Sequence, residues 1–417
     1  MKGFQIKFPS TAMVLLALAC GAPAVEGQVM VAGAGNSGFR APPPNLVSGG
    51  SLGLGDGAEG ALRDFSLSLA SSLFYDTNAG QSPDTPEYPV QADLVLMLSP
   101  MVQWSRASKD WNFALSANGS YGENFNEDQY NTKNYGFNGS AGYRAGRLSL
   151  AGDVSQSFNE GSNRFYGGIV SQMDYGLGLS AAYEINPKTS LTSSFSSSWS
   201  QPDDSFGETE SRSGNLSAMW RYSSLLRFGP GLGYGSSSGD LQTTRTTWGP
   251  TLSADYKLSN KVSLSARGGL DFVSYDGDDS GDGGSDHAFS TEINASYALN
   301  ARCGMSLSLS RGVQADGSLE GSFREGTALR FSVNQKIGGK LTAAVGLGYE
   351  HSAYLTDSGM TPRPAVDFYT GDFTLSMPWW GDRASAATFI RYTGSVSDDP
   401  LQDWNGLQTG VSINLNF

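Results

Sequence analysis

The sequence predicts an all-β protein, a transmembrane antiparallel up-and-down β-barrel of about 18 strands with short periplasmic turns and long outer loops. Three observations carry this prediction. Apolar and polar residues alternate in segments of about ten residues, the length a tilted strand needs to cross hydrocarbon. Tight turns alternate with longer loops between these segments. Tyr, Trp or Phe often stand at their ends, where an interfacial aromatic girdle belongs.

Composition supports strands and turns over helices. Among the 417 residues, 54 are Gly, 11% are aromatic and 16% are charged. Abundant Gly and aromatics with few charges suit strands and turns. The net charge of -13 argues against nucleic acid as a partner, because phosphate binding needs clustered Lys and Arg.

Residues 1–24 are predicted to be a signal peptide. Lys2 and Lys7 form its basic start, residues 11–19 its apolar run, and Ala22-Pro23-Ala24 its cleavage pattern. The run is too short to span a bilayer. Cys20 stands at an imperfect lipoprotein processing site, so its lipidation is the alternative to its removal with the signal. After removal, Cys303 would be the single cysteine, which excludes an intramolecular disulfide.

Residues 25–63 are predicted to be a flexible periplasmic lead-in to the barrel. From residue 28 onward this segment is rich in Gly, contains Pro42-Pro43-Pro44 and has little periodicity. The alternative is that it folds back into the pore as a plug, as happens in large barrels. Residues 64–417 are assigned to the barrel itself.

The first predicted strand sets the pattern for the others. Phe65, Leu67, Leu69 and Tyr75 share one face, and small residues stand between them. In the next strands one parity is apolar in the same way, and its members include Leu94; Trp111, Phe113 and Leu115; Tyr135, Phe137 and Tyr143; Leu148, Leu150 and Val154; Tyr175, Leu177 and Leu179; Leu191, Phe195 and Trp199; Leu216, Ala218 and Trp220; and Phe228, Leu232 and Tyr234.

The second half of the chain repeats the alternation. Its apolar parity includes Trp248, Leu252 and Tyr256; Val262, Leu264 and Leu270; Phe289, Ile293 and Tyr297; Met305, Leu307 and Leu309; Leu329, Phe331 and Val333; Leu341, Val345 and Leu347; Tyr369, Phe373 and Leu375; and Thr388, Ile390 and Tyr392. The predicted strands therefore cover residues 65–75, 94–104, 111–121, 134–143, 148–158, 173–185, 190–200, 212–222, 226–236, 246–258, 262–274, 287–299, 303–313, 325–336, 341–350, 367–379, 384–395 and 407–417.

The last strand is predicted to close the barrel by pairing with the first. Its apolar parity would face lipid, with Asn414 and Asn416 facing the lumen and Phe417 at the periplasmic interface. A soluble β-solenoid or giant sandwich would also explain the alternation. It would not explain the rhythm of short and long loops, and it would need another apolar layer over every strand, a cover that lipid supplies.

Short motifs add a family resemblance. Phe74-Tyr75-Asp76-Thr77-Asn78, followed by residues 94–100 with the sequence LVLMLSP, resembles the putative β-barrel porin families found with exopolysaccharide export systems. The architectural resemblance covers residues 65–417 and implies an outer-membrane channel, and it carries over no catalytic residues. The alternation ending in Phe417 resembles the C-terminal strand that outer-membrane barrels present to the barrel-assembly machinery, which makes Phe417 the predicted assembly signal.

A barrel of this size leaves a lumen too wide for its own side chains to fill. Its inward positions are mostly small and polar, and neighbouring strands show no sustained ladder of inward aromatics, which weakens specific sugar transport without excluding polysaccharide passage. Scattered charges could set a transverse field that selects solutes, or could pair with one another to hold the wall together. The candidate lumen-facing charges are Asp153, Asp255, Arg267, Asp271, Glu292, Arg330, Asp372 and Arg391.

Enzymatic and metal-binding alternatives find little support. Glu350-His351-Ser352 is the one cluster that suggests a lipase, but it shows no positioned base with an orienting third group, so we predict no enzyme. A calcium loop would use Asp276, Asp278, Asp282 and Asp286, but the twelfth position of that register is His287 and not Glu. A solvated acidic loop is the better interpretation, and no cofactor is predicted.

The predicted function is passive or semi-selective diffusion of small hydrophilic solutes through an outer-membrane channel of a Gram-negative-type bacterium. An exopolysaccharide export pore and a non-conducting surface adhesin or structural barrel remain the alternatives. The expected partners are outer-membrane lipid, the barrel-assembly machinery, and small solutes or polysaccharide, and many general porins are homotrimers. The sequence does not identify the solute.

Overall fold

The computed structural model describes residues 65–84, 89–162, 169–202, 207–239, 242–276, 286–315, 323–355, 364–381 and 383–417. The predicted signal peptide and lead-in, including Cys20, lie outside these residues. In the described part of the chain eighteen strands form one sheet. The strands are β1 (Phe65–Asp76), β2 (Asp93–Ala107), β3 (Trp111–Asn124), β4 (Thr132–Ala145), β5 (Leu148–Ser162), β6 (Ile169–Asn186), β7 (Thr189–Pro202), β8 (Thr209–Arg221), β9 (Leu226–Gly239), β10 (Gln242–Tyr256), β11 (Val262–Asp276), β12 (Asp286–Asn300), β13 (Cys303–Ala315), β14 (Phe323–Ile337), β15 (Leu341–Leu355), β16 (Val366–Pro378), β17 (Ala384–Ser397) and β18 (Trp404–Asn416).

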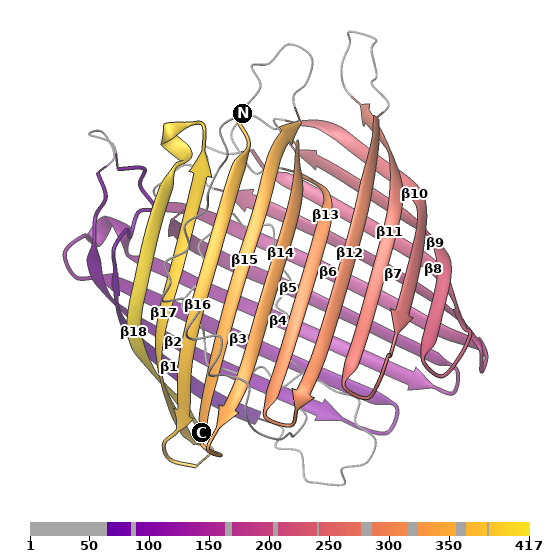
Figure 1. Ribbon diagram of the computed structural model, residues 1–417, viewed down its shortest axis with the longest axis horizontal. Coiled ribbons are helices and arrows are strands. Elements are labelled where there is room, and N and C mark those ends of the chain that lie inside the picture. The colour runs from indigo at the N-terminus through magenta and orange to yellow at the C-terminus, as the bar shows by residue number, and fades with distance from the viewer. Residues whose placement is uncertain are drawn as a thin grey trace.

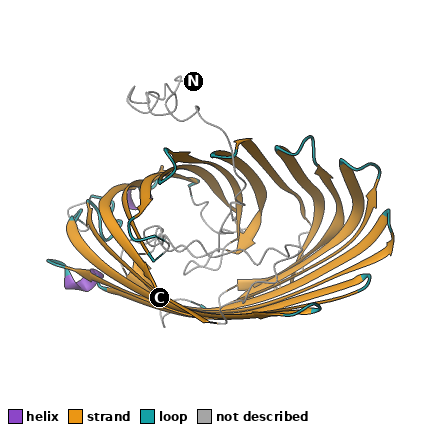
Figure 2. Cartoon of the chain, turned by 90° about the horizontal axis from the view of Figure 1, so that it is seen from below, coloured by secondary structure: helices purple, strands orange, loops and turns teal. Residues whose placement is uncertain are grey.

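The sheet is a closed antiparallel up-and-down barrel, as predicted. Every strand pairs with its neighbours along the chain, and β1 pairs with β18 in the register Ser68–Asn416 to Asp76–Gln408. Figure 1 shows the strands running side by side and tilted, with the C-terminus at the end that carries the tight turns. Figure 2 shows the same strands as a ring around the lumen. Closure leaves no strand edge without hydrogen-bond partners, which a sheet in lipid requires.

The alternation along each strand decides which face meets lipid. On β1, Leu67, Leu69, Leu73 and Tyr75 are exposed on the outer surface, and the residues between them point inward. On β18, Leu407, Val411 and Ile413 are exposed in the same way, while Gln408, Ser412 and Asn414 are buried. The outer surface is therefore apolar around the barrel, as a lipid-facing wall must be.

Aromatic side chains on neighbouring strands contact one another near both ends of the outer wall. At the end with the long loops, Tyr175 and Trp199 stack with ring centroids 5.2 Å apart, and Trp248 lies 4.8 Å from Phe272. At the end with the tight turns, Trp111 lies 4.6 Å from Tyr143. The two rows correspond to interfacial girdles, where an amphipathic ring can contact hydrocarbon and headgroups together.

The predicted strand boundaries differ from the structure mainly at the long-loop end. β6 begins at Ile169 rather than 173, and β10 begins at Gln242 rather than 246. These strands continue beyond the lipid-facing band, where apolar alternation is no longer needed. The backbone hydrogen bonds of the sheet therefore extend further than the alternation in the sequence. Two short 3-10 helices, η1 (Asp128–Tyr130) and η2 (Pro400–Gln402), were not predicted. No helix among the described residues is long and apolar enough to cross a membrane.

The junction of β17, β18, β1 and β2, where the barrel closes, is called the closing seam. Side chains pack closely across β18 at this seam. Gly410 pairs with Phe74 of β1 on one side and with Phe389 of β17 on the other. The two rings meet over this glycine with centroids 6.0 Å apart. A Cβ at position 410 would collide with the Phe74 side chain and would lie 2.5 Å from the carbonyl oxygen of Leu73. Glycine at this position therefore lets two aromatic side chains cover the seam, a known way of supporting a strand glycine.

We predict that Gly410→Ala destabilises the folded barrel by about 1–3 kcal/mol, the usual range for overpacking a tight site. Urea unfolding in lipid vesicles, followed by heat-modifiable mobility, measures the change. Gly312→Ala on β13 is the matched control, because a Cβ there meets no atom within 4 Å. Equal stability of the two variants would contradict a special role for Gly410.

Deletion of Phe417 is predicted to reduce assembly before it alters conduction. The backbone N–H of Phe417 donates to the carbonyl oxygen of Leu67 at 2.8 Å, while its side chain stays exposed. The yield of heat-modifiable, membrane-inserted protein is the measurement, and Phe417→Tyr, which keeps the ring, is the control. Normal yield of the deletion variant would argue against Phe417 as an assembly signal.

Candidate functional site: the inner wall of the barrel

The inner wall encloses a cavity of about 1650 Å³ that is lined mainly by small polar residues. The alternation explains this lining, because positions between the lipid-facing residues carry Ser, Gly, Asn and Thr. On β7 the inward row includes Ser194, Ser196 and Ser198, all exposed to the lumen. Short hydroxyl side chains leave space for water and present both donors and acceptors to it.

Six of the eight candidate charges line this cavity. They are Arg267, Asp271, Glu292, Arg330, Asp372 and Arg391. The other two, Asp153 and Asp255, are not among its lining residues.

Several of the eight candidates have polar partners on the wall. Asp255 pairs with Arg227 at 2.8 Å. Arg267 donates from Nη2 to Oδ1 of Asn215 at 2.7 Å, and Glu292 accepts from Asn294 at 2.9 Å. Arg330 is exposed to the lumen. The structure thus contains both arrangements considered for these charges, those tied to the wall and those presented to the cavity.

A row of polar residues crosses the closing seam at right angles to the strands. Asp372 on β16 stands directly opposite Arg391 on β17, Arg391 opposite Gln408 on β18, and Gln408 opposite Asp76 on β1. Asp76 in turn stands opposite Asp93 on β2. Gln408 Nε2 donates to Asp76 Oδ2 at 2.9 Å. Opposed charges therefore lie side by side on the inner wall, where they can orient water and discriminate between ions.

Sequence analysis missed Asp76, Gln408 and Asp93 as members of this row. The alternation along the strands could have placed them on the inner wall, because Asp76 lies on the inward face of β1 and Asp93 lies on the same face of β2 as Val95 and Met97. Only the strand register shows that they are neighbours.

Asp93 and Asn78 form hydrogen bonds with loop residues at the end of the barrel that carries the long loops. Asp93 is 1% exposed, and its carboxylate accepts from the backbone N–H groups of Leu94, Asn126 and Glu127 and from the Asn126 side chain. Asn78 donates to the carbonyl oxygens of Ser82 and Asn405. The motif from Phe74 to Asn78 that carried the family resemblance thus joins β1 to β18 at this rim.

The expectation of no inward aromatic ladder needs a correction at the seam. Phe74 and Phe389 point inward with Val95 and Met97, and a second inward cluster holds Val366, Phe368 and Trp404. Phe368 and Trp404 both stand opposite Ser395, so a small residue again lies between two large rings. Each of these rings comes from a different strand, β1, β16, β17 or β18, which is why no single strand displayed a ladder. They are nearly fully buried and do not form an exposed aromatic track.

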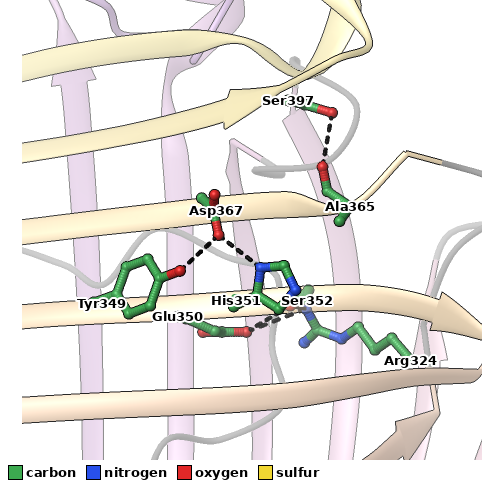
Figure 3. Close-up of polar contacts among 8 residues, drawn as sticks. All are labelled: Arg324, Tyr349, Glu350, His351, Ser352, Ala365, Asp367 and Ser397. Atoms are coloured by element: carbon green, nitrogen blue, oxygen red, sulfur yellow. Dashed lines mark hydrogen bonds and ion pairs between the residues drawn. The ribbon is translucent and has the colours of Figure 1, made fainter. Parts of the chain in front are cut away.

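The Glu350-His351-Ser352 cluster is divided between the two faces of β15 (Figure 3). His351 lies with Tyr349 and Asp367, and its Nδ1 is 2.8 Å from Asp367 Oδ1. Ser352 lies with Glu350 and Arg324, whose Nη1 is 3.1 Å from the Ser352 hydroxyl and 3.2 Å from Glu350 Oε1. Adjacent strand residues point to opposite faces, so His351 is not placed to activate Ser352.

The calcium hypothesis falls mainly on residues that the structure does not describe. Asp278 and Asp282 lie outside the described residues, and Asp276 and Asp286 end the flanking strands β11 and β12. Within the described ranges no group of three or more His, Cys, Asp or Glu could hold a metal ion. The Cys303 side chain is buried.

A closed barrel with an apolar outer wall, aromatic girdles and a polar cavity defines an outer-membrane β-barrel of the channel-forming class. Residues 140–298 match the family model described as putative beta-barrel porin-2, OmpL-like. The match agrees with the resemblance seen in the sequence motifs, and together with the barrel it supports an outer-membrane channel for small solutes.

Two solved outer-membrane proteins resemble the chain at low sequence identity. The FrpB iron transporter from Neisseria meningitidis, F5-1 variant in its apoprotein form, is 9% identical with a TM-score of 0.50, over 86% of this chain and 82% of that one. OpdK from Pseudomonas aeruginosa, crystallised with vanillate, is 13% identical with a TM-score of 0.44, over 86% of this chain and 100% of that one. The likeness to FrpB concerns the fold alone. No curated protein matches the chain.

Asp93→Ala is predicted to loosen the outer rim, because it leaves several part-buried N–H groups without their acceptor, a loss of roughly 1–3 kcal/mol. Hydrogen exchange of residues 124–131 should become faster, with little change on β7. Asp128→Ala is the control, since Asp128 is exposed on the same loop. Unchanged exchange at residues 124–131 would show that the Asp93 carboxylate does not hold the loop.

Proposed function

We propose that the channel admits small hydrophilic solutes by passive or semi-selective diffusion. The observation that carries this proposal is the polar lining of a cavity inside a closed, lipid-faced barrel. Serine, glycine and asparagine bind solutes weakly, so a solute could enter and leave without being trapped. Selectivity would come from the charges, above all Arg330 and the opposed pair Asp372 and Arg391.

The layout proposed for the whole chain is a cleaved signal peptide at residues 1–24, a periplasmic lead-in at 25–63 and the barrel at 64–417. Insertion into the outer membrane of a Gram-negative-type bacterium would use the barrel-assembly machinery, with Phe417 as its signal. Assembly as a homotrimer is part of the same proposal. The apolar outer wall and its girdles support the membrane location.

Two other functions compete with diffusion. An exopolysaccharide exporter would need a continuous surface for sugar rings, but the inward aromatics at the seam are almost completely buried. A surface adhesin or structural barrel would not conduct. The mixed charge of the cavity wall favours a water-filled passage over both.

Single-channel recording in planar bilayers separates the three functions. Steady, ohmic openings of the full chain support diffusion. A channel that stays closed until residues 28–63 are deleted supports a plugged exporter. Absence of openings in both forms would favour the adhesin and contradict the proposal.

Arg330→Glu is predicted to raise the cation-to-anion permeability ratio roughly two- to fourfold, as expected for reversing one charge within about a Debye length of the ion path. Reversal potentials in asymmetric KCl give this ratio. Lys340→Glu is the matched control, because it makes the same charge change in the exposed turn after β14. An equal effect of both variants would show that Arg330 does not act on ions inside the channel.

A further inference from the structure

A Lys or Arg occurs at each of the eight tight turns that join strands in the described part of the chain. Each stands in the turn or at the strand residue next to it. From β2 to β9 they are Lys109, Arg147, Lys188 and Arg221, and from β10 to β17 they are Lys257, Arg302, Lys340 and Arg383. All eight residues are exposed. We call them the turn ring, which surrounds the periplasmic end of the barrel.

The turn ring is positive although the chain as a whole carries a net charge of -13. Among the described residues, the carboxylate side chains next to the tight turns are Asp110, Glu184 and Asp255. Asp255 is paired with Arg227, which is not a member of the ring, at 2.8 Å. The eight cations therefore exceed the two remaining side-chain carboxylates and the C-terminal carboxylate, which lies at the same end of the barrel (Figure 1).

Neighbouring members of the turn ring act on ions together. Two strand spacings, roughly 10 Å, separate one tight turn from the next, which is about one Debye length in physiological salt. Lys and Arg stay charged at neutral pH. Arg147 is also held along the rim, because its Nη1 donates to the carbonyl oxygen of Ile185, beside the next turn, at 3.0 Å. The ring thus forms a band of positive potential around the rim.

Exposed apolar side chains stand beside the cations at five of these turns, and they indicate which partner the turn ring meets. They are Ile185, Tyr222, Leu258, Ile337 and the pair Trp379 and Trp380. The two tryptophans, next to Arg383, are 69% and 68% exposed. Apolar side chains with long basic side chains next to them suit the edge of a membrane, where the apolar part meets hydrocarbon and the charge reaches the headgroups. A soluble acidic protein would not cover apolar side chains around the whole rim.

We propose that the turn ring binds the phosphate groups of anionic phospholipids in the periplasmic leaflet of the outer membrane. Guanidinium and ammonium groups form strong, charge-assisted hydrogen bonds with phosphate oxygens. A phospholipid with net negative charge is favoured over a zwitterionic one, because no headgroup cation offsets its attraction to the ring. The bound lipids would fix the depth of the barrel in the membrane. This binding does not depend on whether the lumen conducts.

Association of spin-labelled lipids with the full-length protein in phosphatidylcholine vesicles tests the proposal. Electron spin resonance gives the ratio of the association constants of labelled phosphatidylglycerol and labelled phosphatidylcholine. We expect a ratio of at least about three at low salt, falling toward one in about 0.5 M NaCl, because salt screens the ring. A ratio of one at low salt would overturn the proposal.

Charge-removing variants show whether the turn ring causes the preference. The combined substitutions Lys188→Gln, Lys257→Gln and Lys340→Gln should lower the ratio by about half, whereas Arg at the same three positions should preserve it. The matched control removes three exposed cations from the outer surface at the long-loop end, by Lys133→Gln, Arg212→Gln and Arg311→Gln. It should keep the ratio. Heat-modifiable mobility confirms that each variant is folded, and an equal loss in the ring and control variants would overturn the proposal.

Two further measurements on the same vesicles separate the other outcomes. Binding of soluble polyglutamate that requires the ring, together with a lipid ratio of one, would assign the ring to an acidic soluble partner and overturn the lipid proposal. Single-channel recording tests the diffusion function independently. If the protein does not conduct, that function fails, and the lipid ratio still decides whether the turn ring binds anionic phospholipid.

Discussion

The requirement that every backbone N–H and C=O group find a partner inside the membrane dominates this structure. A sheet in lipid meets it only by closing on itself, so the pairing of β1 with β18 decides whether the fold exists. The chain concentrates special chemistry there. Gly410 leaves space for two aromatic rings to meet, and the Gln408 side chain donates a hydrogen bond to Asp76. The Asn78 side chain donates a hydrogen bond to the carbonyl oxygen of Asn405 and so connects the first loop to β18. The same seam carries the opposed charges Asp372 and Arg391 and the two inward aromatic clusters, so residues that close the barrel also line its inner wall.

Most of the fold follows from one period in the sequence. Side chains of a strand alternate with a period of two, and each of the eighteen predicted segments kept its apolar parity on the outer wall. Pairing followed because an up-and-down barrel joins strands in chain order and the last strand must meet the first. The boundaries at the long-loop rim were less accurate, because strands such as β6 and β10 extend past the lipid-facing band where the pattern fades.

The inner-wall features were harder to predict because they depend on register between strands. Parity places Asp76, Gln408 and Arg391 on the inside, yet their adjacency requires two separate strand alignments, and a slip of one residue would turn a side chain to the other face. The same reasoning explains why Phe368 and Trp404 went unnoticed as a pair. The lipase hypothesis rested on the adjacency of His351 and Ser352 in the sequence, but adjacent residues of a strand lie on opposite faces.

One face of each strand meets lipid and the other meets water. Labelling four single-cysteine variants on β7 with a membrane-impermeant thiol reagent tests this most directly, with the protein in lipid vesicles and Cys303 replaced by Ala. Ser194→Cys and Ser196→Cys point into the lumen and should be modified, whereas Ser193→Cys and Ser197→Cys point to lipid and should be protected. Uniform labelling at all four positions would contradict the barrel as described.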